Sequence, residues 1–494
     1  MNKVKIRKSV GKISITDFSK FAKTSQNIGN TLACKSIYNF KNVNGCLEKG
    51  MGINHLMVRY EDKVNTYQYQ LNLGLDERTF NKVMYFKQFF KQSGDTTHRL
   101  LFHCDNNKLY MFELFSNTNE LTWVYELEFD TIPAVLEYKK DDVDSILISS
   151  TNKLVVWTTD QVPYEITDVP TITSMCEYND TLYCTIATES EKLWYTESLD
   201  PLNIGKDEFS DYIVLDAGIG GGCKVLQFNE SVYVFCDYGI YRVNTYAQDQ
   251  PTVRLIYSGT GRINPDTIMA CGTHVLFVST DGVYKFNGDT VLKVDELTDL
   301  LQNADNTYAT ATYFHGCYYL ASTINFEDSY VMGCETMLSP NFKNNALVKF
   351  DLNNKTWEIL RGVDIKYMLP LHAGAEEKII CTFNSLDKYR IGEITNEGMV
   401  FDNVLQRTYI TNYFVPENME QVIIRSVSID SSKSVQVRIV TDSKTDEFIM
   451  RSEGYKNFST YIPCRKFQIE IVSKNKDAYS NSPRLRCAVR GPGW

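Results

Sequence analysis

Short alternating strands recur along most of this chain, and the recurrence limits the folds open to it. Runs of alternating apolar and polar residues, broken by Asn, Asp and Gly turns, fall into groups between residues 83 and 395. The groups start near residues 83, 134, 172, 223, 268, 309 and 365, so each spans about 38 to 56 residues. A repeat of this length that holds about four strands is typical of a β-propeller blade.

The inside of each unit also repeats. An apolar strand meets a short polar turn, a second strand follows, and a third strand ends in Tyr or Trp; the first turns read "YNDT", "FNES", "CGTH" and "FHGC". One four-stranded sheet leaves both faces incompletely buried, and packing blades around an axis covers them. We therefore predict an all-β chain with a propeller over residues 83–395. Seven blades is the expected number, with six or eight as alternatives.

The segments on either side of the propeller differ from it. Residues 36–82 contain lead-in strands that supply either a further blade or a closing strand. After Thr395 the strands are longer and lose the blade rhythm, and Phe467, Ile469 and Ile471 alternate onto one face, which predicts a C-terminal β-sandwich over residues 396–494.

Residues 1–35 are predicted to form a basic N-terminal arm. Up to Thr24 they hold seven Lys or Arg and one Asp, against a net charge of −10 for the whole chain. The arm is expected to dock on an acidic protein neighbour or to remain solvated, and a transit peptide is the alternative.

Composition excludes several classes of protein. The acidic balance argues against broad wrapping of nucleic acid. The 13 cysteines include no C-x-x-C pair, so zinc ribbons and thioredoxin-like motifs are unsupported, and reduced thiols in the core of a protein made in a reducing cytosol are expected. No apolar run approaches the roughly 20 residues that span a bilayer, so no membrane segment is expected.

A glycine cluster, "DAGIGGGCKVLQF" at 216–228, resembles a phosphate-binding loop at first sight. A Walker loop needs Ser or Thr after its lysine and a helix behind it, but Lys224 is followed by alternating strand sequence. A dinucleotide fingerprint also requires a helix. We predict instead that the four glycines, Gly218, Gly220, Gly221 and Gly222, let the chain pass between two blades with backbone angles that other residues avoid.

No other pattern points to catalysis. The six histidines show no H-x-x-x-H or H-E-x-x-H spacing, no G-x-S-x-G elbow occurs, and Asp141 and Asp142 fall in a turn. The histidines are His55, His98, His103, His274, His315 and His372. We predict no catalytic, cofactor-binding or metal-binding residues, no cofactor and no enzymatic activity. Two distant carboxylates in the propeller channel, as in a glycosidase, remain the alternative.

Two further segments carry expectations. The sequence "VDELTDLLQNA" at 294–304 predicts a helix with Leu297, Leu300 and Leu301 on one face. An irregular insert at 323–345 interrupts the sixth unit and is a candidate contact with a partner.

A family resemblance rests on three stretches in order: "LWYTESLDPLNI" at 193–204, "KVLQFNESVYVFCDYGIYRV" at 224–243 and "VLFVSTDGVYKFNGDTVLKV" at 275–294. Together they resemble the propeller-type structural proteins of tailed bacteriophage virions, over roughly residues 172–360. Members of that family sit at the tail, neck or nozzle of the virion or stabilise the head–tail region. The resemblance implies no catalytic residues.

We therefore expect a non-enzymatic virion protein, made in the bacterial cytoplasm, that assembles as a ring-shaped homo-oligomer. Other tail, neck or portal-proximal proteins are the expected partners, and DNA would pass through a channel without specific binding. The alternative is a glycan-binding or glycan-hydrolysing propeller, which needs exposed tryptophans. The five tryptophans stand at 123, 157, 194, 357 and 494, and the first four fall late in different blades, which favours packing. A cellular scaffold propeller of the kelch or WD type is a weaker interpretation, because this chain lacks the Gly-His and Trp-Asp signature.

Overall fold

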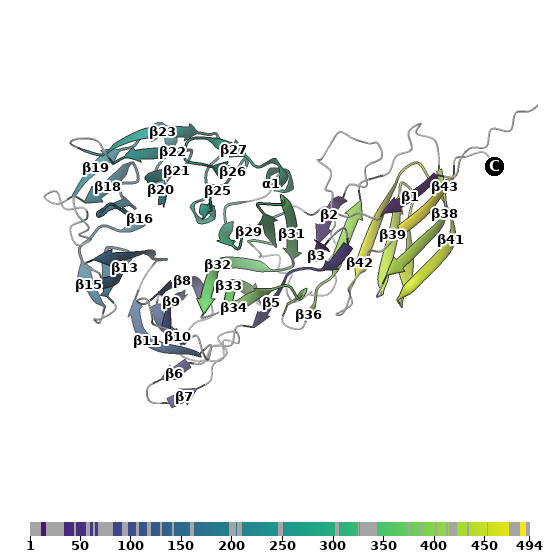
Figure 1. Ribbon diagram of the computed structural model, residues 1–494, viewed down its shortest axis with the longest axis horizontal. Coiled ribbons are helices and arrows are strands. Elements are labelled where there is room, and N and C mark those ends of the chain that lie inside the picture. The colour runs from purple at the N-terminus through teal and green to yellow at the C-terminus, as the bar shows by residue number, and fades with distance from the viewer. Residues whose placement is uncertain are drawn as a thin grey trace, which may run out of the picture.

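The fold is known from a computed structural model (Figure 1). It describes residues 11–15, 34–43, 46–55, 60–62, 65–67, 83–90, 97–104, 108–115, 120–128, 131–140, 143–158, 163–196, 204, 210–245, 250–301, 306–324, 326, 343–373, 376–385, 388–400, 403–411, 413, 422–431, 434–451, 453–473 and 485–490. The described chain is almost entirely β-structure, with one short α-helix and two 3-10 turns.

Six antiparallel sheets follow one another along the chain, each with four strands in sequence order. Blade one holds β8 (Val83–Phe90), β9 (Thr97–Cys104), β10 (Lys108–Phe115) and β11 (Glu120–Glu128). Blade two holds β12 (Ala134–Lys140), β13 (Val143–Ser150), β14 (Lys153–Thr158) and β15 (Tyr164–Thr167). Blade three holds β16 (Ile172–Tyr178), β17 (Thr181–Ile186), β18 (Lys192–Thr196) and β19 (Ser210–Val214).

The next three blades repeat the arrangement. Blade four holds β20 (Gly222–Phe228), β21 (Ser231–Cys236), β22 (Gly239–Asn244) and β23 (Thr252–Ser258). Blade five holds β24 (Met269–Cys271), β25 (His274–Ser279), β26 (Gly282–Phe286) and β27 (Val291–Lys293). Blade six holds β28 (Thr310–Phe314), β29 (Cys317–Ser322), β30 (Ala346–Asp351) and β31 (Thr356–Arg361). The 3-10 turns η2 (Ala217–Ile219) and η3 (Pro265–Thr267) lead into blades four and five.

The seventh blade takes its fourth strand from the other end of the chain. It combines β32 (Asp364–Ala373), β33 (Glu376–Ser385) and β34 (Lys388–Thr395) with β5 (Gly52–His55), which pairs antiparallel with β34. A small hairpin, β35 (Met399–Val400) and β36 (Asn403–Val404), extends this sheet. The lead-in segment 36–82 therefore contains a strand that closes the last blade. It also forms the hairpins β3 (Phe40–Val43)–β4 (Cys46–Lys49) and β6 (Tyr60–Asp62)–β7 (Asn65–Tyr67).

The blades form a closed wheel around a central axis, as Figure 1 shows. First strands are neighbours around the axis: β16 lies against β12 and β20, and β32 lies against β28. Strand β32 also lies against β8 of blade one, which joins the last blade to the first. The prediction of an all-β chain with a seven-bladed propeller is confirmed by these sheets.

Turn chemistry explains why the first and second strands of the blades meet so tightly. Two-residue turns join them at Asn179–Asp180 and Asn229–Glu230, where both central residues have positive φ. Hairpin turns whose twist matches that of the strands require this conformation, which Asn, Asp and Gly adopt most readily. Blade six uses His315 and Gly316 at the same place. The polar turns in the sequence are therefore the local signals that set the blade register.

The apolar core lies between blades. Each hydrophobic cluster combines second and third strands of one blade with those of the next, as a wheel of twisted sheets requires. Buried pairs of residues that share a cluster across neighbouring blades are Val156 and Trp194, Tyr183 and Val234, Phe235 and Phe277, Leu276 and Leu320, and Leu347 and Ile379. Helix α1 (Asp295–Leu300) adds to the cluster between blades five and six, with Leu297 and Leu301 buried as predicted.

The glycine cluster connects blades three and four, as predicted, but of its four glycines only Gly220 has the left-handed backbone angle that was expected. Gly220 has φ of 81°, and a Cβ there would stand 2.6 Å from the Cβ of Asp237. At Gly221 and Gly222 a Cβ would approach the side chains of Ser190 and Thr185 within 2.5 and 2.9 Å. Side chains of blades three and four lie so close to the connection that these three positions accept only glycine. Strand β20, and not a helix, follows the cluster, so it is not a phosphate-binding loop.

Replacing Gly220 by alanine is expected to lower the free energy of unfolding by about 2–4 kcal/mol, since it adds backbone strain and steric overlap. Gly218→Ala is the matched control, because its nearest contact is the exposed Asp216 side chain at 3.3 Å, and it should change stability by less than about 0.5 kcal/mol. Urea denaturation followed by tryptophan fluorescence measures both variants. Equal midpoints for the two variants would contradict this account of the cluster.

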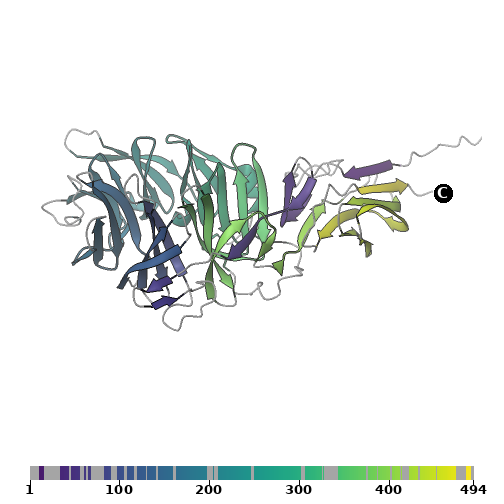
Figure 2. The ribbon, with the colours of Figure 1, turned by 60° about the horizontal axis from the view of Figure 1, so that its bottom comes forward.

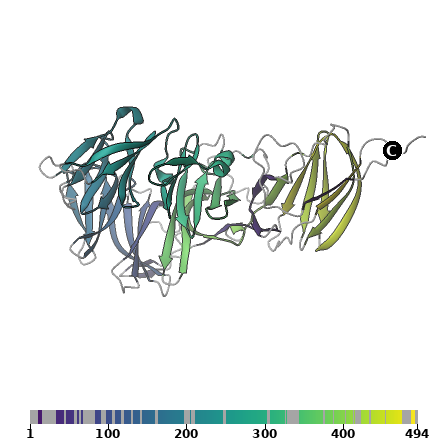
Figure 3. The ribbon, with the colours of Figure 1, turned by 45° about the horizontal axis from the view of Figure 1, so that its top comes forward.

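The β-sandwich is built from both ends of the chain. One sheet has the order β1 (Gly11–Ile15), β43 (Leu485–Arg490), β38 (Val422–Ser431), β41 (Gly454–Cys464). The other has the order β2 (Cys34–Tyr38), β37 (Arg407–Thr411), β42 (Phe467–Ser473), β39 (Val435–Thr441), β40 (Thr445–Met450). Phe467, Ile469 and Ile471 face the core between the sheets, as their alternation predicted. Figures 2 and 3 show the sandwich beyond one side of the wheel.

Part of the predicted basic N-terminal arm, residues 1–35, belongs to this sandwich. Its residues 11–15 form the edge strand β1, in register with β43 from Gly11↔Val489 to Ile15↔Leu485. The charge of this segment, from which the arm was inferred, carries no information on strand pairing. The insert at 323–345 lies mostly outside the described residues.

Asn39 fixes the joint between the propeller and the sandwich. It is fully buried, has φ of 60°, and its backbone N–H donates to the Ile359 carbonyl at 2.7 Å. Its side-chain amide donates to the carbonyls of Gln406 at 2.8 Å and Arg361 at 3.3 Å, and its Oδ1 accepts from the Arg361 N–H at 2.7 Å. One residue thus binds the last strand of blade six to the segment that enters the sandwich.

Candidate interaction surfaces

The outermost strands of four consecutive blades expose apolar side chains. We call this surface the apolar rim, and its residues are Tyr164 (β15), Tyr212 and Val214 (β19), Leu255 (β23) and Leu292 (β27). Val214 is 63% and Leu292 55% exposed. Each of these strands is the edge of its sheet, so its outward side chains face solvent in a single copy. A series of exposed apolar residues on a stiff scaffold is typical of a contact surface.

Ionic and aromatic contacts hold the Tyr212 ring in place. Its centroid lies 5.0 Å from that of Trp194, and the Lys192 ammonium lies 4.1 Å from the Tyr212 ring. Glu189 accepts hydrogen bonds from Lys192 Nζ and Trp194 Nε1, both at 3.0 Å. The hydrogen bond to Glu189 raises the pKa of Lys192, so the cation over the ring persists at neutral pH. Tyr212 is thereby ordered before any partner binds, which lowers the entropy that binding would cost.

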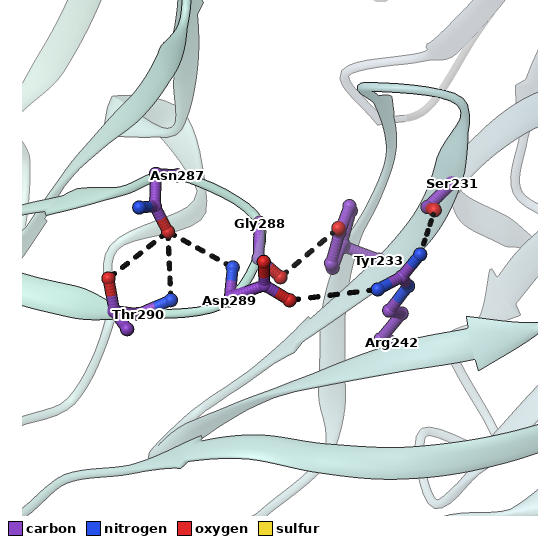
Figure 4. A network of polar contacts seen from close by, with 7 residues as sticks. All are labelled: Ser231, Tyr233, Arg242, Asn287, Gly288, Asp289 and Thr290. Carbon is purple, nitrogen blue, oxygen red and sulfur yellow. Dashed lines mark hydrogen bonds and ion pairs between the residues drawn. The ribbon is translucent and has the colours of Figure 1, made fainter.

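A polar network locks the next part of the rim (Figure 4). The Tyr233 hydroxyl of blade four donates to the Gly288 carbonyl of blade five at 3.2 Å, and Arg242 approaches Asp289 at 3.7 Å. Within the β26–β27 turn, Asn287 Oδ1 accepts from the Asp289 and Thr290 N–H groups. These bonds fix the turn that presents Leu292. The Tyr233 and Arg242 contacts join blade four to blade five, so they hold the exposed part of the rim in a fixed position.

The sandwich carries a second exposed surface along β41. We call it the basic–tyrosine strip, and it consists of Tyr455 and Tyr461 of β41 with Arg425 of the neighbouring strand β38. Tyr455 is 65% and Tyr461 59% exposed, and they share a face because they are six residues apart on one strand. The Arg425 guanidinium lies 4.7 Å from the Tyr461 ring centroid. β41 is also the edge of its sheet.

The tryptophans whose side chains the structure describes serve packing, as their late position in each blade predicted. Trp157 and Trp194 are buried, and Trp357 packs between the propeller cluster and the sandwich cluster. None of these three side chains is an exposed platform for a sugar ring.

The two histidines whose side chains the structure describes contact different partners. His274 Nδ1 contacts the neighbouring Thr273 hydroxyl at 2.9 Å. His315 Nε2 pairs with Glu377 Oε2 between the first turns of blades six and seven. His55 lies in β5, His98 and His103 in β9, and His372 in β32. Among the residues that the structure describes, no group of three His, Cys, Asp or Glu side chains could hold a metal ion.

Burial suppresses the reactivity of several cysteines whose side chains the structure describes as free thiols. It raises the pKa of Cys176, Cys236 and Cys271 to about 12 each, so these thiols stay protonated at neutral pH. We predict that iodoacetamide at pH 8 leaves the three thiols largely unmodified in the native protein and labels them fully in urea, because thiolate is the reactive form. Peptide mapping by mass spectrometry measures this. Rapid native labelling of any of the three would contradict it.

The sequence alone did not single out the apolar rim or the basic–tyrosine strip. A signal was present in the alternation, since Tyr212 and Val214, and likewise Tyr455 and Tyr461, are separated by even numbers of residues. Which face of each strand is buried depends on the neighbouring blade or sheet, and that information is not local.

The chain matches no protein-family model and no curated protein. Solved structures that are similar include BBS1N in complex with ARL6DN, with 13% identity and a TM-score of 0.39 over 61% of this chain and 87% of that chain. Another is KlHsv2 with loop 6CD replaced by a Gly-Ser linker, with 11% identity and a TM-score of 0.32 over 53% of this chain and 80% of that chain. Similarity this low carries no argument about function. Within the described ranges, no helix has the length and apolarity needed to cross a bilayer.

Proposed function

We propose that this protein is a non-enzymatic structural component of a tailed bacteriophage virion. It is made in the host cytoplasm and assembles as a multimeric ring in the tail, neck or nozzle region. The resemblance of residues 193–204, 224–243 and 275–294 to such proteins supports the proposal, and these stretches lie in blades three to five. The same blades carry most of the apolar rim.

The observation that carries the proposal is the apolar rim on a closed wheel. Its side chains stand on the outer strands of consecutive blades, with Tyr212 ordered by Trp194 and Lys192. A wheel whose blades two to seven pack closely on one another is stiff, and stiff subunits suit closed rings, in which one patch meets a different patch on the next copy. Contact with tail, neck or portal-proximal proteins follows from the same geometry, and DNA would pass without specific binding.

Two measurements test the proposal together. Mass photometry and negative-stain microscopy of the purified full chain should show ring-shaped particles of uniform mass. Mass spectrometry of purified virions from the source of the sequence should detect the protein at several copies per particle. A protein that stays monomeric at tens of micromolar and is absent from virions would contradict the proposal.

A glycan-active propeller is the alternative class of function. Release of reducing sugar, or binding on a glycan array that survives 0.5 M salt, would favour it. The buried positions of Trp157 and Trp194 give it no support.

A further inference from the structure

Tyr38 belongs to both domains of the protein. Its backbone pairs with Thr408 in the five-stranded sheet of the sandwich, because Tyr38 is the last residue of β2. Its side chain is fully buried in the hydrophobic cluster between blades five and six. Strand β2 lies against β31 of blade six at this joint (Figure 1). The Tyr38 side chain therefore holds the sandwich against the wheel.

Arg361, the last residue of β31, connects Tyr38 to the insert at 323–345. Its guanidinium carbon lies 4.7 Å from the centroid of the Tyr38 ring and 3.9 Å from that of the Phe326 ring. The two rings also meet edge to face, with their centroids 5.4 Å apart. Cation–π contacts strengthen as the cation loses water, and Arg361 is partly buried. Phe326, which lies in the insert, therefore contacts one residue of each domain.

The described ends of the insert are joined to each other and to the same strand. The Ile324 N–H donates to Asn345 Oδ1 at 2.8 Å, and Asn345 Nδ2 donates to the Ile324 carbonyl at 2.9 Å. The Asn345 carbonyl accepts from the Gly362 N–H at 3.3 Å, directly after Arg361 in the chain. A displacement of the insert base therefore reaches Arg361 through its side chain and through the next peptide group.

The backbone of Arg361 holds the joint. Its N–H donates to Asn39 Oδ1 at 2.7 Å, and its carbonyl accepts from Asn39 Nδ2 at 3.3 Å. Asn39 directly follows Tyr38, so two consecutive residues bind the main chain and the side chain of Arg361. Residues that share a partner in one network are energetically coupled. The insert base and the joint are therefore coupled through Arg361.

We propose that the contact of Phe326 with Arg361 and Tyr38 is a latch through which the insert base and the joint control each other. With the Phe326 ring seated, the sandwich is held rigidly on the wheel. With the ring displaced, the Arg361 side chain is released and the joint loosens. Such coupling is reciprocal, because the free energy that links two sites is the same from either side. The inference does not depend on the proposed function, since all these contacts lie within one copy.

Two variants of the full chain test the latch from its two sides. Phe326→Ala removes the ring, and Asn39→Gly removes the amide while it keeps the backbone conformation. Hydrogen exchange followed by mass spectrometry reads the opposite side in each case. The Asn39 N–H, which donates to the Ile359 carbonyl, reports the joint in Phe326→Ala. The Ile324 N–H reports the insert base in Asn39→Gly.

We expect exchange at each distant reporter to become about three- to tenfold faster, as the loss of one partly buried cation–π contact allows. Phe326→Tyr keeps the ring and should exchange like the wild type. Tyr308→Ala is the matched control, because the exposed Tyr308 ring contacts the Lys343 ammonium, 4.6 Å away, at the returning end of the insert. This control should leave exchange at Asn39 unchanged.

A double-mutant cycle measures the coupling. The fall in urea midpoint in the Phe326→Ala, Asn39→Gly double variant should be smaller than the sum of the two single falls, because each substitution disables the same latch. Strictly additive falls would refute the latch. Unchanged exchange at Asn39 in Phe326→Ala would also refute it, as would equal loosening in Tyr308→Ala. If Phe326→Ala fails to fold by circular dichroism, exchange at Ile324 in Asn39→Gly decides the question.

Discussion

Replacing Ile53 by aspartate is expected to open the propeller, with a loss of stability of about 4 kcal/mol or more, because it places an uncompensated charge in a filled core. Ile53 lies in β5, the strand that completes blade seven, and is fully buried. It pairs with Ile394 on one side and Val400 on the other. A Cβ added at Gly392 would overlap the Ile53 side chain, so this seam has no spare volume.

Differential scanning fluorimetry and limited proteolysis measure the effect. The first thermal transition should fall by about 5–10 °C in Ile53→Asp, and proteases should cut within residues 364–395 sooner. Asn54→Ala is the control, because Asn54 is the next residue on the strand, is only partly buried, and makes one exposed hydrogen bond to Glu397 at 3.3 Å. It should change stability by less than about 1 kcal/mol. Similar transitions in the two variants would show that β5 is not needed for closure.

Replacing Asn39 by alanine is expected to cost about 3 kcal/mol or more at the joint between propeller and sandwich. The substitution removes the buried amide that binds Arg361 and Gln406 and leaves their backbone groups without these partners. It also places a residue other than Asn or Gly at φ of 60°. Asn39→Gly keeps the backbone conformation at low cost and loses only the amide.

The two substitutions separate backbone strain from hydrogen bonding. Urea midpoints should fall in the order wild type, Asn39→Gly, Asn39→Ala. Small-angle scattering should show a broader distribution of distances in both variants, because the amide links the last strand of blade six to the sandwich. An Asn39→Gly protein that matches the wild type in both measurements would show that the amide does not hold the joint.

Local patterns were enough to predict the blades. The pairs Asn179–Asp180 and Asn229–Glu230 are turn signals that a reader of the sequence can recognise, and the strands around them alternate with period two. The same is true of α1, where Leu297 and Leu301 are one helical turn apart. These features follow from interactions among residues close in the chain.

Non-local pairing could not be predicted in the same way. Strand β5 has four residues and pairs with a strand more than 330 residues away, from Gly52↔Thr395 to His55↔Gly392. Strand β1 pairs with β43 across a still longer separation. Short strands carry too little sequence to specify such partners. The rim and strip were missed for a related reason, since exposure is decided by neighbouring sheets.

The interleaving of both chain ends in the sandwich has a consequence for how the molecule is made. Strands β1 and β2 leave the ribosome before the propeller does, yet their partners β43 and β37 follow the whole propeller. Domains fold as units during synthesis, so we expect the wheel to form while the two early strands wait. A chain interrupted before residue 485 would hold a finished wheel and an unfinished sandwich. Only a chain synthesised past the last strand, β43 (Leu485–Arg490), could therefore complete both domains.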